Sequence, residues 1–138
     1  MRQSFFLFIV LIASMLIYSC KSHKLDLKSS MVGHWELRKT KNTQNGSSKI
    51  FPPGKGINLF FTDTSYEEFS EGSMISMGKY KFIQDTDKLS GDLSSKVVFK
   101  PEIYSWDTTR FVIGFEGNQL IIRVDSVGAL IRFYERLD

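Results

Sequence analysis

Short stretches of alternating apolar and polar side chains recur along this chain, and turn-forming residues separate them. In residues 33–40, for example, Trp35 and Leu37 share one face while charged side chains take the other. A period of two is the mark of a half-buried β-strand, and no segment shows a sustained helical repeat. Further strand-like stretches are residues 57–62, 65–70, 74–83, 96–100, 110–116, 119–124 and 129–136. The chain is therefore expected to be all-β.

Tight turns join these stretches without long crossovers. Gly117-Asn118 is a two-residue hairpin signal, and Asn45-Gly46 marks another turn. Short strands at near-regular spacing form sandwiches or barrels. Because the strands follow one another as successive hairpins, we expect an up-and-down antiparallel β-barrel of about eight strands. Closure also removes exposed strand edges, a hazard in a chain rich in Phe, Ile and Val.

The alternation also predicts which side chains face the barrel interior. The inward set, which is also the candidate set of ligand-lining residues, is Leu59, Phe61, Tyr80, Phe82, Phe111, Ile113, Leu120 and Ile122. Phe60 and Ile121 are expected on the outer face. An eight-stranded barrel is filled by its own side chains or holds one small ligand. The bulk of the inward set favours a small cavity or none.

The N-terminus carries a targeting signal. Residues 5–17 are almost wholly apolar, Arg2 precedes them, and Cys20, the single cysteine, follows shortly after them. This order is typical of a signal peptide, and residues 17–20 (IYSC) resemble a bacterial lipobox. The apolar run is shorter than the roughly 20 residues that span a membrane. The sequence therefore predicts a signal peptide over residues 1–19 and lipidation of Cys20, which anchors the chain stably through its acyl chains.

The predicted mature chain has two parts. Residues 20–30 form a polar tether, and residues 31–138 form one domain. The lysines of the tether either hold the domain near an anionic leaflet or lie in a solvated spacer. Many surface-displayed bacterial lipoproteins carry acidic residues just after the lipidated cysteine, and residues 21–25 contain none. The departure from that pattern implies an outer membrane position that faces the periplasm, within the cell envelope. A nearly neutral mature chain without a basic stripe indicates no nucleic-acid partner.

Several motifs together resemble small bacterial lipocalin-like lipoproteins of the Bacteroidota type. Residues 31–37 (MVGHWEL) are similar to the Gly-x-Trp opening of that family, residues 78–80 (GKY) to a later hairpin, and residues 132–137 (RFYERL) to its last strand. The resemblance covers residues 31–138 and implies a lipocalin-like barrel. It further implies that Gly33 and Trp35 close the barrel floor, and that an arginine, either Arg132 or Arg136, packs over the tryptophan.

The sequence offers no set of residues for catalysis or metal binding. The domain has one histidine, His34, so it has neither a Ser-His-Asp arrangement nor a zinc-ligand pattern. Glu67, Glu68 and Glu71 are read as surface charges, and the Asp85-x-Asp87 pair lacks the rest of a calcium loop. The expectation is a non-enzyme without cofactor or metal.

Two functions remain open at this point. The first is a non-catalytic binder of a small apolar ligand, since barrel mouths are favoured ligand sites. The second is a filled-barrel protein that contacts another envelope protein. Trp106 lies in a loop after Pro101. It either stacks on a ligand or partner, as interface aromatics do, or caps an edge of the core.

Overall fold

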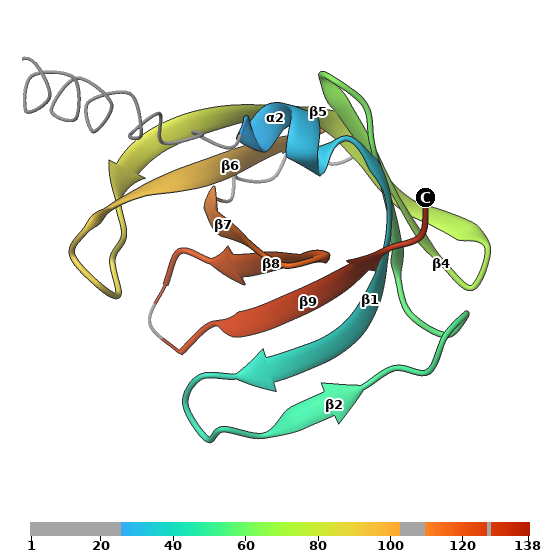
Figure 1. Ribbon diagram of the computed structural model, residues 1–138, viewed down its shortest axis with the longest axis horizontal. Coiled ribbons are helices and arrows are strands. Elements are labelled where there is room, and N and C mark those ends of the chain that lie inside the picture. The colour runs from blue at the N-terminus through green and yellow to red at the C-terminus, as the bar shows by residue number, and fades with distance from the viewer. Residues whose placement is uncertain (1–25, 103–109, 127) are drawn as a thin grey trace, which may run out of the picture.

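The computed structural model describes residues 26–102, 110–126 and 128–138 of the 138-residue chain (Figure 1). Apart from one short helix, α2 (Leu27–Met31), the elements of this part are strands. The strands are β1 (Gly33–Asn42), β2 (Ser48–Ile50), β3 (Asn58–Phe61), β4 (Ser65–Ser70), β5 (Ser73–Thr86), β6 (Leu93–Pro101), β7 (Arg110–Glu116), β8 (Gln119–Val124) and β9 (Leu130–Arg136). The all-β prediction is confirmed.

Eight of these strands close into an antiparallel up-and-down barrel, as predicted. From β3 to β9 each strand pairs with the next one in sequence. β1 closes the barrel because it pairs with both β3 and β9, and Trp35 lies opposite Leu59 on one side and Arg136 on the other. β2 lies outside the closed ring and pairs only with β1, in a position visible at the lower edge of Figure 1.

The described segment before the barrel contains a short helix. Residues 27–31 form α2, which begins at the N-cap Asp26, whose side chain accepts a hydrogen bond of 3.2 Å from the Lys28 amide. The side chain of Met31 is fully buried in the barrel core. Residues 27–30, the last residues of the predicted tether, are therefore helical, and the helix ends at a residue that is buried in the core. Its five residues are too few for a periodic pattern to reveal.

The barrel interior holds the side chains that alternation predicted. Leu59, Phe61, Tyr80, Ile113, Leu120 and Ile122 are buried in one core cluster, and Phe82 and Phe111 are partly buried against it. Phe60 points outward, is 38% exposed and stacks on the ring of His34 at 3.9 Å. Tyr66, Val97, Leu37 and Tyr134 complete the interior. The backbones of β5 and β6 approach each other closely at Gly78, where an added Cβ would lie 2.2 Å from the Lys100 carbonyl oxygen.

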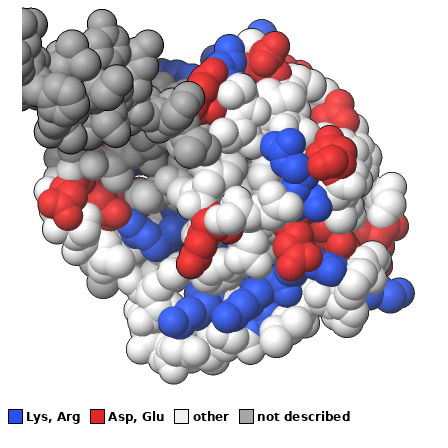
Figure 2. Space-filling model, viewed as in Figure 1, with Lys and Arg blue, Asp and Glu red and all other residues white. Residues whose placement is uncertain are grey.

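On the face shown in Figure 2, acidic and basic side chains are interspersed, and basic ones gather in the lower part of the view, over β1 and β2. Lys41 and Lys49 are exposed members of these two strands.

A buried ion-pair cluster joins the β5–β6 hairpin to β8 and the turn after it. The Lys96 ammonium is fully buried, donates to Asp125 at 2.7 Å and to the Thr86 carbonyl at 2.5 Å, and has Asp85 at 3.7 Å. Arg123 pairs with Asp87 in the same cluster. The Asp85-x-Asp87 pair, which lacks the rest of a calcium loop, thus compensates buried cations, a condition for placing such charges inside a protein.

Candidate ligand cavity

The closed end of the barrel is built around Trp35. Its side chain is 2% exposed, and its indole Nε1–H donates a 2.8 Å hydrogen bond to the Met31 carbonyl. The Arg136 guanidinium lies 4.7 Å from the centre of the indole ring and donates to the carbonyls of Ser30 and Val32 at 2.7 and 3.0 Å. One arginine thus covers the tryptophan and fixes the chain segment between α2 and β1.

Arg136, and not Arg132, is the arginine of the barrel floor. Arg132 lies four residues earlier on β9 and lines a cavity inside the barrel instead. Gly33, the other floor residue expected from the resemblance, has φ +137°, a conformation that favours glycine. A Cβ added there would lie 2.9 Å from the Asp138 carboxylate. Of the two arginines that the resemblance left open for the floor, Arg136 is the one that lies over the indole ring.

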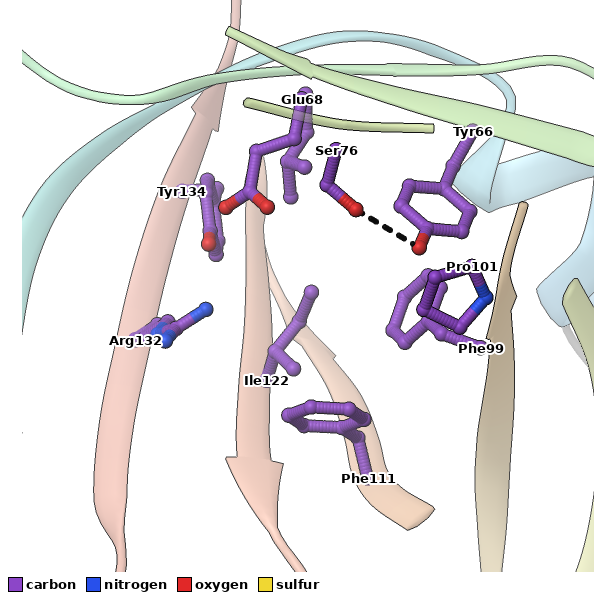
Figure 3. Close-up of a pocket in the computed structure, with 10 residues that line it drawn as sticks. Tyr66, Glu68, Ser76, Phe99, Pro101, Phe111, Ile122, Arg132 and Tyr134 are labelled. Carbon is purple, nitrogen blue, oxygen red and sulfur yellow. Dashed lines mark hydrogen bonds between the residues drawn. The ribbon is translucent and has the colours of Figure 1, made fainter. Parts of the chain in front are cut away.

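A cavity of about 190 Å³ lies inside the barrel (Figure 3). Seven strands contribute its lining, which consists of Leu59, Tyr66, Glu68, Ser76, Phe99, Pro101, Phe111, Ile122, Arg132 and Tyr134. Apolar and aromatic side chains form most of its wall. In Figure 3 the polar ends of Glu68, Tyr134 and Arg132 lie together on one side, and Tyr66, Phe99 and Pro101 lie on the other.

Pairing registers explain how these residues meet. Glu68 lies opposite Leu59 across β3 and β4 and opposite Ser76 across β4 and β5, so all three point inward. Tyr134 lies opposite Leu37 on β1 and Leu120 on β8, both of which are buried in the core. Arg132 is two residues before Tyr134 on β9 and therefore takes the same face.

The hydroxyl group of Tyr134 is the most unusual polar group of the cavity. The side chain is 0% exposed, and its hydroxyl oxygen is buried without a hydrogen-bond partner. Burial raises the pKa of Tyr134 to about 12 and the charge of Glu68 adds to the shift, whereas the Arg132 guanidinium opposes it through its charge and through a direct side-chain interaction. The hydroxyl is therefore neutral and able to donate at any physiological pH. A buried polar group without a partner costs stability.

Glu68 and Arg132 provide opposite charges on the same side. Burial raises the pKa of Glu68, and the Arg132 guanidinium lowers it only in part. No salt bridge within 4.0 Å involves Arg132 in the described ranges. On the other side, the Tyr66 hydroxyl and the Ser76 hydroxyl lie 3.1 Å apart and satisfy each other. The wall of the cavity thus holds a cation and a carboxyl group, and the buried Tyr134 hydroxyl lies beside them.

The candidate ligand-lining residues fall into three groups. Leu59, Phe111 and Ile122 line the cavity. Phe61, Tyr80, Phe82, Ile113 and Leu120 do not line it, and belong to or pack against the core around it. Trp106 and the lipidation residue Cys20 lie outside the described residues.

Sequence reasoning missed the polar residues of the cavity. Glu68 was grouped with its acidic neighbours Glu67 and Glu71, which are indeed exposed. The alternation of side chains along a strand could have revealed these residues. Tyr66 and Glu68 are two residues apart and share one face of their strand, and Arg132 and Tyr134 share one face of another strand.

No metal-binding cluster of three or more His, Cys, Asp or Glu residues occurs in the part of the chain that the structure describes. Within that same part, no helix combines the length and the apolar character that a membrane crossing requires. No family model matches the chain, and comparisons with curated proteins and with solved structures give no significant match.

A stability measurement tests the burial of Glu68. The pKa of Glu68 is raised in the folded state. The stability that its protonated form allows is therefore fully present below the unfolded-state pKa of about 4.3, and it is lost as pH rises through the folded-state pKa. Glu68→Gln is therefore expected to raise the melting temperature by a few degrees at pH values near 8 and by less near pH 4. Glu67→Gln, an exposed neighbour, should change little. Equal melting curves for wild type and Glu68→Gln at both pH values would contradict the assignment.

Proposed function

We propose that this protein binds a small, mainly apolar ligand inside its barrel and has no catalytic role. The observation that carries the proposal is the cavity lined by Leu59, Phe111 and Ile122, with the unpartnered Tyr134 hydroxyl at its side. Ligand sites are typically apolar concavities with a few polar groups that fix orientation. The chain combines both features in one place.

The size of the cavity limits the ligand. A volume of about 190 Å³ is below the 300–1,000 Å³ of typical small-molecule sites. At roughly 30 Å³ for each water-sized group, it holds about six such groups. A short-chain or single-ring compound fits this space, whereas a long acyl chain would have to project through the mouth.

A series of linear alcohols from four to twelve carbons tests the proposal. The protein would be a soluble chain starting at residue 21, which includes the whole described barrel, and binding would be followed by NMR. Each added methylene should improve the dissociation constant about fourfold, which is the equivalent of 0.8 kcal/mol, up to about six carbons. Beyond that length the gain should level off.

A matched pair of variants locates the binding. Ser76→Leu adds a side chain to the cavity and should abolish binding, whereas Ser73→Leu adds the same side chain at an exposed position of β5 and should not. Absence of saturable shifts for every alcohol in the wild-type protein would favour the second candidate, a filled barrel that contacts an envelope protein. The exposed Ile50 on β2, at 75%, is the feature that favours that candidate, because β2 pairs only with β1.

We also propose that the barrel is attached to the bacterial outer membrane through lipidated Cys20 and faces the periplasm. The support is the apolar run of residues 5–17 that ends shortly before the single cysteine. Cys20→Ala should give an uncleaved or mis-sorted precursor that no longer partitions into detergent as the wild type does. Ser19→Ala, at the neighbouring position, keeps a small residue before the cysteine and should mature normally. If Cys20→Ala matures and partitions like wild type, the anchor is elsewhere.

A further inference from the structure

The polar side of the cavity combines three groups that no single simple ion satisfies. Arg132 supplies a permanent cation, Glu68 supplies a carboxyl group, and Tyr134 supplies a hydroxyl without a partner. Arg132 and Tyr134 come from β9, and Glu68 comes from β4. Figure 3 shows the three polar ends on the same side of the cavity. A head group placed among them meets two donors and one acceptor.

Charge restricts which head group fits. A cationic head would face the Arg132 guanidinium, which is always protonated. A permanently anionic head would face Glu68 and, in a partly buried site, the repulsion between like charges is strong. With Glu68 ionised, Glu68 and Arg132 have a net charge near zero, so the site favours a head that is itself neutral.

We propose, on the basis of the proposed ligand function of this cavity, that the ligand carries a neutral planar head with a carbonyl acceptor beside a hydrogen-bond donor. A protonated carboxylic acid and a primary amide share this chemistry. The carbonyl oxygen accepts hydrogen bonds from Arg132 and Tyr134, and the O–H or N–H group donates to the carboxylate of Glu68. This arrangement gives the Tyr134 hydroxyl the partner that it lacks.

The two head groups differ in their proton balance. A carboxylic acid is ionised in water near pH 7, so its binding takes up one proton from solvent, and that proton lies between the ligand and Glu68. The raised pKa of Glu68 favours this sharing. The other titratable groups lining the cavity, Tyr66, Arg132 and Tyr134, keep their protons, since burial raises the pKa of both tyrosines. Affinity for the acid should therefore fall up to tenfold for each pH unit above neutrality, whereas affinity for the amide should not.

Four six-carbon amphiphiles test the proposal by NMR titration of the soluble chain. The probes are hexanoic acid, hexanamide, hexanesulfonate and hexylamine, and the titrations are run near pH 6 and near pH 8. We expect hexanoic acid to bind up to about 100-fold more weakly at the higher pH. Hexanamide should change less than about twofold, and the sulfonate and the amine should give no saturable shifts.

Variants identify the residue that takes part in proton sharing. Glu68→Gln replaces the carboxylate with a neutral amide and leaves Arg132 uncompensated. It should remove the pH dependence of hexanoic acid and allow hexanesulfonate to bind. Glu67→Gln, on the outer face of the same strand, should behave as wild type. If Glu68→Gln does not fold, the pH dependence of hexanoic acid binding to the wild-type protein still tests the proposal.

The outcomes separate this inference from the proposed function. If all four probes bind alike at both pH values, the cavity is a purely apolar site, and the head-group inference is overturned while the binding function stands. If the sulfonate or the amine binds best, the inference is likewise overturned. If no probe and no alcohol binds, both are overturned.

Discussion

Trp35→Ala is expected to lower the free energy of unfolding by about 3–5 kcal/mol, the range found when a buried aromatic side chain is truncated. The indole ring is 2% exposed, and Arg136 and Phe115 lie close to it, with Phe115 at 6.0 Å between ring centres. Its loss opens a cavity at the closed end of the barrel and removes the hydrogen bond to the Met31 carbonyl. In a domain of this size the melting temperature should fall by roughly 12 °C or more.

Two further variants show that the effect belongs to the barrel floor. Trp35→Phe keeps a ring under Arg136 but loses the Nε1–H donor, so it should cost less than Trp35→Ala. Ile50→Ala truncates a side chain that is 75% exposed and should melt within about two degrees of wild type. Denaturant unfolding followed by circular dichroism measures all three. A Trp35→Ala protein as stable as Ile50→Ala would show that α2 and the floor do not pack as described.

The sequence predicts the strands well where alternation ends at an unmistakable turn. β7 and β8 have the bounds expected from residues 110–116 and 119–124, because Gly117-Asn118 fixes both ends of the hairpin. Barrel closure also follows from the succession of antiparallel strands, since from β3 to β9 each strand pairs with the next one in sequence. These features are local, and periodicity reports local structure.

Features that depend on register across the barrel cannot be predicted in this way. Arg132 and Arg136 have the same parity on β9, so both point inward, and only the pairing of Trp35 with Arg136 decides which one covers the indole ring. β2 has three exposed residues and no apolar face, and it exists because β1 extends beyond β3. The sequence alone contains no signal for either.

The polar side of the cavity represents an intermediate case. Strand alternation places Tyr66 and Glu68 on the same face of one strand, and Arg132 and Tyr134 on the same face of another. It does not show that these two faces meet inside the barrel. The usual rule that charged residues lie at the surface leads to the wrong placement of Glu68. Positions at which such rules fail are often functional, which is one more reason to assign a ligand to this cavity.

Removing the ammonium of Lys96 is the second change with a large expected effect. Lys96 is 0% exposed, and its partner Asp125 is 6% exposed at 2.7 Å. Lys96→Met leaves the Asp125 carboxylate buried with only the Lys88 amide as a hydrogen-bond donor, at 3.1 Å. Breaking a buried pair by removing one partner costs about 3–5 kcal/mol. Lys100→Met, an exposed lysine on the same strand, is the matched control and should cost little.

The pH dependence of this loss tests its electrostatic cause. Burial alone would raise the pKa of Asp125, but the hydrogen bond and charge of Lys96 outweigh it, and the pKa is lowered. A lowered folded-state pKa gives stability that is present above the unfolded value of about 3.9 and lost as pH falls through the folded value. In Lys96→Met the carboxyl group becomes easier to protonate, so the cost of the substitution should shrink as pH falls from about 7 to about 4. The double variant Lys96→Met/Asp125→Leu, which removes both charges, should regain much of the stability at pH 7. If Lys96→Met is equally destabilising across this pH range and the double variant is no better, the loss comes from packing and not from an uncompensated charge.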